Sequence, residues 1–416
     1  MNSTLKRKKA GKATEGRQFL AFVGLAYVAQ GIAQHFCLLA QPLDYFLLKE
    51  AGQNAAQVAF LLSLLMIPWM VKPVYGIMSD FLPLAGYRRK SYLVLAYACS
   101  SLLYGLAACT GSLYLLWPAL FLTACALAMG TTIISGLVLA VGRPNGHTRR
   151  YQSFQAVCYY TANIFSLLVG GLLCSYLPPA SALHTACWLA SLPCLLAAFA
   201  SWYWLREERA VPVRLDLATM AAGVALLRSR GLFVVTIFLC FWHFSPGFGT
   251  PLYFHETRVL GFSQLFIGQL GAVNSVGMIA GALLFRFVLE QKLSPKHQAV
   301  LAVLTGTIST ISYLSLASPL SAVVLEFFRG LANILAILTV YGLVADVSPP
   351  KLESTAIALL ISAFNVAEQL GNNLGAYLYV YVFGNSFGGL VAVSAMATLA
   401  CIFIVPWLPE EDRFSS

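Results

Sequence analysis

Twelve apolar segments, separated by short polar stretches, dominate this chain and limit what it can fold into. A helix crosses the hydrocarbon core of a bilayer with roughly 20 mainly apolar residues, and each segment is about that long. In lipid the backbone must satisfy its hydrogen bonds within the segment, so the spans must be helical. The segments lie near 19–40, 57–78, 91–111, 113–141, 153–177, 183–205, 231–254, 265–289, 298–317, 320–345, 355–383 and 387–408. We predict an all-α integral membrane protein with twelve transmembrane helices.

The composition argues against an ordinary soluble domain. Hydrophobic residues make up 59% of the 416 residues and charged residues only 10%, whereas a soluble domain carries about 25% charged residues. The ten cysteines fall inside apolar runs without a CxxC spacing, and we interpret them as small buried side chains. No phosphate loop, HExxH or GxSxG pattern occurs, so the sequence predicts neither a cofactor nor a metal.

The basic residues predict the orientation in the membrane. Most of the 26 Lys and Arg residues fall in the N-terminal tail and in alternate loops, whereas the opposite loops hold only Lys49 and Arg258. By the positive-inside rule, both tails, 1–18 and 409–416, are predicted to be cytoplasmic, in a plasma or organellar membrane. The basic start is typical of a signal peptide, but we favour a retained first span because the apolar stretch runs to about Ala40 without a clean cleavage site. The same distribution accounts for the net charge of +10 without nucleic-acid binding.

The two halves of the chain resemble each other. PLDYFLLKEAG at 42–52 is similar to PLYFHETRVLG at 251–261, an offset of 209, and GLVLAV at 136–141 is similar to GLVADV at 342–347, an offset of 206. Offsets close to half the chain predict a parallel duplication into two six-helix bundles. The predicted parts are an N-terminal bundle at 19–205, a cytoplasmic linker at 206–230 and a C-terminal bundle at 231–408.

A charged stretch between the second and third spans carries a family resemblance. Pro68-Trp69, Gly76-x-x-x-Asp80 and Gly86-Tyr87-Arg88-Arg89 resemble the folate–biopterin transporter family within the major facilitator superfamily. The resemblance implies two six-helix bundles of the major facilitator type, a folate, biopterin or related pteridine substrate, and transport driven by a proton gradient. The family usually has an Asp and a Glu after its fourth span, but this chain has no acidic residue between Asp80 and Glu207. A coupling role for those acids therefore cannot be transferred.

The same stretch predicts a gate at the inner face. Asp80 ends the second span, Arg88 and Arg89 begin the third, and Asp346 lies in the matching GLVADV segment. Such charges can latch one half to the other if the latch is worth only a few kcal/mol. The alternative is that the basic residues serve topology alone. Glycines at positions 76 and 86 are expected to permit close approach and a tight turn.

Charged and amide side chains inside the spans predict a substrate site. Glu326 and Arg329 are three residues apart on one helix face. They form either a structural ion pair or a site in which Arg329 binds a substrate carboxylate and Glu326 exchanges a proton. The eleventh span carries a polar stripe of Asn365, Glu368 and Asn372, which we expect to line a cavity, with Glu368 as a second proton carrier.

Other predicted substrate contacts come from the first and seventh spans. Gln30 and Gln34 share a face of the first span, and His243 lies in an aromatic run of the seventh. His35 and Lys72 stay undecided, since a buried histidine is often a core residue and Lys72 is near enough to the inner surface to snorkel. The glycine-rich run at 268–281 of the eighth span predicts close helix packing.

These features favour a monomeric secondary transporter that moves its small-molecule substrate by alternating access and proton symport. Alternatives are a carrier of another heterocyclic or anionic solute, a channel, or a sensor that binds without transporting. An integral-membrane enzyme would need converging nucleophile, base or metal ligands, and the six scattered histidines do not provide them. We therefore predict no enzymatic activity.

Overall fold

The computed structural model describes residues 2–142, 148–207, 209, 230–245, 247–347 and 353–408. Within these ranges the chain is helical, apart from turns and one isolated bridge between Leu84 and Tyr87. Two compact units are present. Unit 1 comprises Met1–Leu43 and Val71–Arg214, and unit 2 comprises Asp44–Met70 and Leu215–Ser416. The predicted all-α class is confirmed, while most of the predicted linker lies outside the described residues.

Helix lengths support the membrane assignment. Ten helices of the described chain are long and apolar enough to cross a membrane, and Gln18–Ala33 forms a shorter apolar helix. The remaining predicted span, 355–383, corresponds to α16 (Glu353–Tyr377) followed by η4 (Leu378–Val382), which carry the polar stripe. The chain is a multi-pass integral membrane protein.

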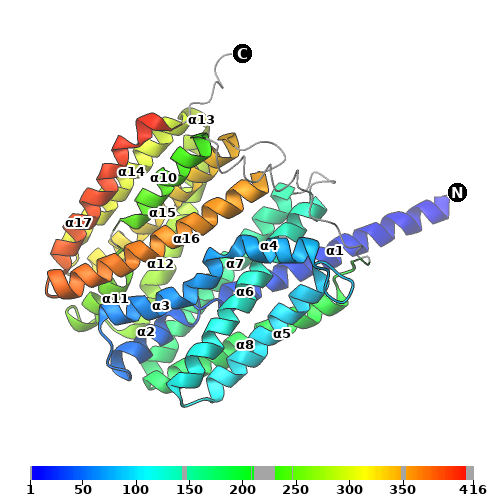
Figure 1. Ribbon diagram of the computed structural model, residues 1–416, viewed down its shortest axis with the longest axis horizontal. Helices are drawn as coiled ribbons and strands as arrows, with labels where there is room; N and C mark the ends of the chain where they lie inside the picture. The colour runs from blue at the N-terminus through cyan, green and yellow to red at the C-terminus, as the bar shows by residue number, and fades with distance from the viewer. Residues whose placement is uncertain are drawn as a thin grey trace. The chain divides into compact units, whose positions relative to one another are not determined.

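Unit 1 is built from long helices that lie side by side in Figure 1. Helix α5 packs most extensively on α8 and α6, and α1 packs on α7 and α8. The elements are α1 (Asn2–Ala33), the start of α2 (Ala40–Lys49), α4 (Lys72–Phe81), α5 (Lys90–Cys109), α6 (Leu113–Gly142), α7 (Thr148–Tyr176) and α8 (Pro179–Tyr203).

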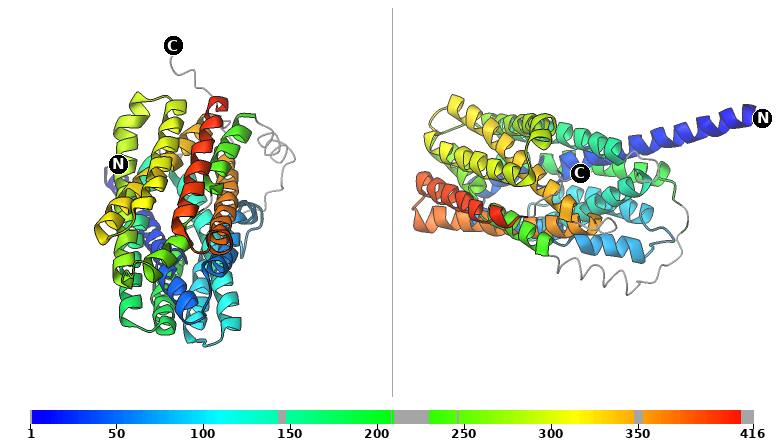
Figure 2. Two further views of the ribbon diagram at one scale, coloured as in Figure 1. Left: turned by 90° about the vertical axis from the view of Figure 1, so that its left-hand side faces the viewer. Right: turned by 90° about the horizontal axis from the view of Figure 1, so that it is seen from above.

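Unit 2 contains the second set of helices, several of which run beside one another in Figure 2. Helix α12 packs on α15, α14 packs on α15 and α17, and α16 packs on α10 and α3. The helices are α3 (Ala55–Met70), α10 (Arg230–Phe244), α11 (Gly249–Arg258), α12 (Gln264–Leu284), α13 (Glu290–Lys292), α14 (Pro295–Ser312), α15 (Pro319–Val347), α16 and α17 (Phe387–Ala400). Short π or 3-10 turns add η2 (Phe285–Leu289), η3 (Tyr313–Ser315), η4, η5 (Cys401–Phe403) and η6 (Val405–Trp407).

The duplication inferred from the sequence recurs in the helix boundaries. Helices α2 and α11 both contain ten residues, and their first residues, Ala40 and Gly249, are 209 positions apart. Each follows an interruption of the helix before it, at 34–39 and at 245–248. The predicted spans near 19–40 and 231–254 each contain an interruption that their apolar composition did not reveal.

The predicted second span is also interrupted, at Val71 between α3 and α4. Pro73 has no N–H with which to bond the carbonyl of Trp69 one turn earlier, so the helical ladder fails there. The side-chain amide of Asn365 donates to that carbonyl instead, at 3.0 Å. Asn365 thus compensates in unit 2 for the hydrogen bond that the proline cannot make.

Close contact between α12 and α15 confirms the packing predicted for the glycine-rich run at 268–281. A Cβ added to Gly277 would meet the carbonyl oxygen of Phe327, and one added to Gly330 would meet that of Asn274. Only residues without side chains allow two helix backbones to approach this closely.

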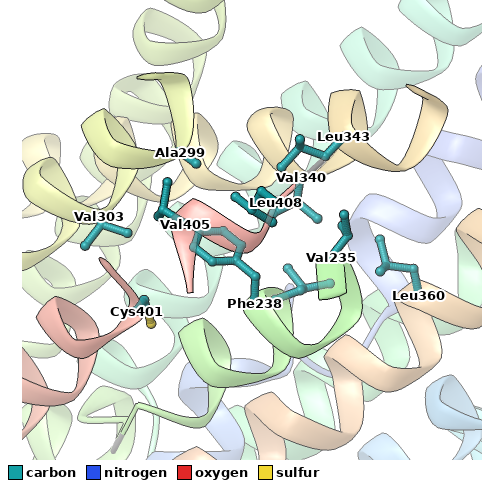
Figure 3. Packing of buried hydrophobic residues seen from close by; sticks show 11 residues of the cluster. Val235, Phe238, Ala299, Val303, Val340, Leu343, Leu360, Cys401, Val405 and Leu408 are labelled. Carbon is teal, nitrogen blue, oxygen red and sulfur yellow. The ribbon is translucent and has the colours of Figure 1, made fainter. Parts of the chain in front are cut away.

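An apolar cluster fills one end of unit 2 (Figure 3). It joins Val235 and Phe238 of α10 to Val303 of α14, Val340 of α15 and Leu360 of α16. Further members are Leu239, Ala299, Leu343, Cys401, Val405 and Leu408. Trp242 packs against this cluster from the side where α10 ends. The cluster holds α10, α14, α15 and α16 against one another and against the turns at 401–408.

A tight turn at Leu84–Tyr87 precedes the basic residues Arg88, Arg89 and Lys90 of unit 1. Leu84 and Tyr87 exchange backbone hydrogen bonds of 2.9 and 3.0 Å around a tight turn, in which Ala85 and Gly86 have positive φ angles of 52° and 83°. The turn predicted at Gly86 is confirmed. In contrast, a Cβ at Gly76 would reach only Thr132, at 3.8 Å, so close packing within unit 1 does not require that glycine.

Glu207 caps the first turn of α5. Its carboxylate accepts hydrogen bonds from the backbone N–H of Arg89, at 3.1 and 3.2 Å, and of Lys90, at 2.7 Å. These N–H groups have no partner within the helix, and a negative charge is favourable at a helix N-terminus.

Replacement of Glu207 with alanine is expected to lower the free energy of unfolding by about 0.5–2 kcal/mol, as loss of a helix cap does. Glu207→Gln keeps an acceptor oxygen and is expected to lose only about 0.3–1 kcal/mol, the part that depends on charge. Thermal unfolding of the purified variants in detergent measures both changes. Equal effects of the two substitutions would contradict the capping role.

Candidate functional site

A cavity of about 340 Å³ lies within unit 2. Helices α10, α12, α14, α15, α16 and α17 all contribute to its wall, and most of the side chains that face it are polar. The lining includes Trp242, His243, Ser245, Asn274, Ser309, Thr310, Arg329, Asn333, Glu368, Asn372, Ser394 and Thr398. Its volume is at the lower end of the range for ligand cavities, about 300–1,000 Å³.

The break between α10 and α11 forms part of the cavity wall. Ser245, Gly247, Phe248 and Gly249 all line it. The Gly247 N–H donates to the carbonyl of Gly371 in α16, at 2.9 Å. Irregular backbone at membrane depth is tolerated where it is buried in protein or lines a cavity. This interruption therefore belongs to the site.

Two glycines of α16 bring the broken segment close. A Cβ on Gly371 would meet the carbonyl oxygen of His243 at 2.5 Å, and one on Gly375 would meet that of Gly247. Asn372 lies between these glycines in sequence and lines the cavity. The GNNLG sequence at 371–375 thus combines close helix contact with an amide at the cavity wall.

Arg329 and Glu326 form an ion pair on α15. The Nε and Nη2 atoms of Arg329 donate to Oε2 of Glu326, at 3.1 and 2.6 Å. The Tyr313 hydroxyl donates to Oε1 at 2.6 Å. Glu326 is buried, whereas 39% of the Arg329 side chain is exposed and the residue lines the cavity. The pair thus holds the guanidinium in place while leaving N–H groups for an anion.

Four of the predicted substrate contacts come together at this cavity: His243, Arg329, Glu368 and Asn372. The His243 ring packs edge-on against Phe364, with centroids 4.1 Å apart. Its Nε2 atom is buried and finds no hydrogen-bond partner among the described residues. Asn365 lies on the same helix as Glu368, but its amide is bonded to Trp69 and it does not line the cavity.

The predicted contacts on the first span form a separate network in unit 1. Gln30 donates to the Tyr97 hydroxyl at 2.9 Å. The Tyr159 hydroxyl donates to Gln34 at 3.0 Å, and Gln34 donates to Thr131 at 3.4 Å. These bonds satisfy buried amides beside the break after α1. Their predicted role in substrate binding stays a prediction.

Neighbouring hydroxyls also satisfy backbone carbonyls at that break. Tyr104 donates to the carbonyl of Ala33, and Ser166 donates to that of Gly31 at 3.0 Å. His35 lies in the broken segment, buried and edge-on to Phe36 with centroids 5.0 Å apart. Side chains of other helices thus replace hydrogen bonds that a continuous helix would supply.

The predicted gating residues are described only in part. The side chains of Asp80 and Asp346 lie outside the described residues, although their backbones belong to α4 and α15. Arg88 and Arg89 occupy the approach to α5 and are partly exposed. Lys72 is the first residue of α4 and is partly buried. The gate stays a prediction.

Two residues near the ion pair were missed by the sequence analysis. Glu256 of α11 is 5% exposed and lies close enough to Glu326 and Arg329 for electrostatic interaction. Tyr313 donates to Glu326, as described above. The repeat offered one signal for Glu256. At the offset of 209, this acid replaces Leu47, an apolar and buried residue of the first half.

Comparison with known proteins gives consistent matches along the chain. A family model described as the BT1 family matches residues 30–416. A folate-biopterin transporter of Synechocystis sp. is 27% identical over 436 residues, covering 94% of this chain and 81% of that protein. A putative folate transporter 2 of Plasmodium berghei is 22% identical over 411 residues, covering 93% and 88%.

Solved structures share the fold at low sequence identity. The POT family transporter PepTSo matches with a TM-score of 0.76 and 12% identity, covering 94% of this chain and 97% of that chain. A D-xylose-proton symporter matches with a TM-score of 0.71 and 12% identity, covering 95% and 98%. The predicted major facilitator type of fold is confirmed.

Proposed function

Because this chain belongs to the BT1 family, we propose that it is a secondary transporter that carries folate, biopterin or a related pteridine across a membrane. The observation that carries the proposal is the cavity of unit 2, whose described lining includes one guanidinium, one carboxylate, several amides and the aromatic side chains of Trp242 and Phe248. It acts as a carrier rather than an enzyme, by alternating access of the site to the two faces of the membrane, with both chain ends in the cytoplasm.

The cavity lining matches the chemistry of a pteridine. This flat heterocycle has hydrogen-bond donors and acceptors along its edge, which the amides of Asn333 and Asn372 and the carboxylate of Glu368 can satisfy. The indole of Trp242 offers a surface for the ring face. A folate also has glutamate carboxylates, and the exposed N–H groups of Arg329 are suited to bind one. The same reasoning admits another anionic heterocycle as a second candidate.

Substitution of Glu368 with glutamine is expected to reduce uptake of labelled folate and biopterin about tenfold, the equivalent of about 1.4 kcal/mol. The substitution replaces a charged acceptor in the cavity with a neutral amide of the same shape. Uptake is measured in proteoliposomes that contain equal amounts of folded protein. Glu50→Gln, an exposed acid-to-amide change at the end of α2, is the matched control.

Counterflow in the same vesicles tests the mode of action. A carrier preloaded with unlabelled substrate takes up labelled substrate faster, whereas a channel or sensor shows no such stimulation. Wild-type protein that binds neither folate nor biopterin, or that shows no counterflow, refutes the proposal. Unchanged uptake by Glu368→Gln removes only Glu368 from the site.

A further inference from the structure

Arg329 and Glu368 line the cavity of unit 2. Two further carboxylates, Glu326 and Glu256, lie near Arg329, and its guanidinium bonds Glu326. Arg329 directs both Nε and Nη2 to Glu326, whose other oxygen accepts from Tyr313. Both carboxylate oxygens of Glu326 therefore already have a hydrogen-bond donor. Glu368 lines the cavity, where solvent and substrate can reach it.

Glu256 is in a different position. It is 5% exposed and interacts electrostatically with both Glu326 and Arg329. Among the described residues, no hydrogen bond to its carboxylate is found. A buried carboxylate beside a second carboxylate, without a donor of its own, is costly to keep charged.

Among the described residues, the helices that pack most closely on α11 provide no cation for Glu256. Helices α3, α12 and α17 contain no charged residue, α16 contributes Glu368 on its cavity side, and η3 contributes Tyr313. On α11 itself, His255 stacks on Phe387 with centroids 4.8 Å apart. Arg258 lies over the Phe254 ring at 4.9 Å. Because Arg258 is two positions from Glu256, the two side chains lie on different faces of α11.

We propose that Glu256 is the proton-binding residue that couples anion binding at Arg329 to proton transport. This inference rests on the proposed function. A substrate carboxylate that approaches Arg329 adds a third carboxylate to those of Glu256 and Glu326. Three negative charges would then surround one guanidinium. A proton from solution that bonds to a carboxylate oxygen of Glu256 removes one of those charges. The proton leaves the same oxygen when the anion leaves, so each ligand favours binding of the other.

The test compares proton uptake on folate binding in wild-type protein, Glu256→Gln and Arg258→Gln. Calorimetry in buffers of different ionisation enthalpy gives the number of protons taken up by the purified protein. Over a series of pH values, the wild type is expected to take up protons on folate binding wherever Glu256 is ionised in the free protein, reaching about one proton per folate bound, by linkage. Glu256→Gln carries a permanently neutral group and is expected to bind folate with no proton uptake. Arg258→Gln, on the same helix but outside the cluster, is expected to behave as the wild type.

Proteoliposomes give a second measurement. An inward proton gradient is expected to drive folate accumulation by the wild type, whereas Glu256→Gln is expected only to equilibrate folate across the membrane. Glu256→Leu, the side chain found at the matching position of the first repeat, should also lack proton uptake and serves if the glutamine variant folds poorly. Proton uptake that persists in either variant overturns the inference. A wild-type protein that does not bind folate refutes instead the proposed function.

Discussion

Replacement of Gly330 with leucine is expected to prevent unit 2 from folding, or to lower its free energy of unfolding by at least about 3 kcal/mol. A Cβ at this position would meet the carbonyl oxygen of Asn274, and it would lie 3.0 Å from the backbone nitrogen of Met278. Both neighbours are backbone atoms of α12 and cannot rotate aside as a side chain can. The helices would have to separate, and the contact between Gly277 and Phe327 would be lost with them.

The yield of folded protein and its thermal unfolding in detergent measure this effect. Gly136→Ala in α6 is the matched control, because no atom lies within 4 Å of the added Cβ. Its free energy of unfolding is expected to change by less than about 1 kcal/mol. A Gly330→Leu protein with normal yield and unfolding temperature would show that α12 and α15 are not held in close backbone contact.

Replacement of Arg329 with methionine is expected to lower the free energy of unfolding by about 1–3 kcal/mol, the usual cost of leaving a buried acceptor without its donor. Glu326 is 4% exposed and, among the described residues, would be left with the Tyr313 hydroxyl as its hydrogen-bond partner. Because the substitution keeps the length of the side chain, the loss arises from the charge rather than from an empty space.

The double variant Arg329→Met, Glu326→Gln separates charge from packing. Removing both charges is expected to restore most of the lost stability, since a buried pair and its neutral replacement often differ little. Thermal unfolding of both single variants, the double variant and the wild type completes the cycle. If the double variant is as unstable as Arg329→Met alone, the pairing with Glu326 does not account for the loss. Folate uptake is expected to be lost in the double variant, because no Lys or Arg then remains among the described residues that line the cavity.

Apolar segment lengths were enough to predict the helical membrane fold. They depend on local composition, which lipid constrains strongly. Helix interruptions were harder to predict. The break at Val71 follows from Pro73, but the breaks at 34–39 and 245–248 depend on hydroxyls and glycines supplied by other helices. No local pattern reveals such distant partners.

The cavity could be predicted only in part, because its wall also depends on residues that are distant in sequence. Spacing on one helix was enough to place Glu326 beside Arg329, and a polar stripe was enough to indicate Glu368 and Asn372. Spacing does not distinguish an amide that faces the cavity from one that repairs a backbone, as Asn365 does for Trp69. Glu256 escaped notice because its partners lie on α15, about seventy residues further along the chain.

The matching interruption in the first helix of each half bears on how the two copies diverged. Both copies kept a ten-residue helix after the interruption, yet α2 has Leu47 where α11 has Glu256. The two halves thus share this short helix but differ in charge at one buried position, since Leu47 and Glu256 are 1% and 5% exposed. The ten-residue frame therefore accepts a carboxylate at a site where the other half has an apolar side chain.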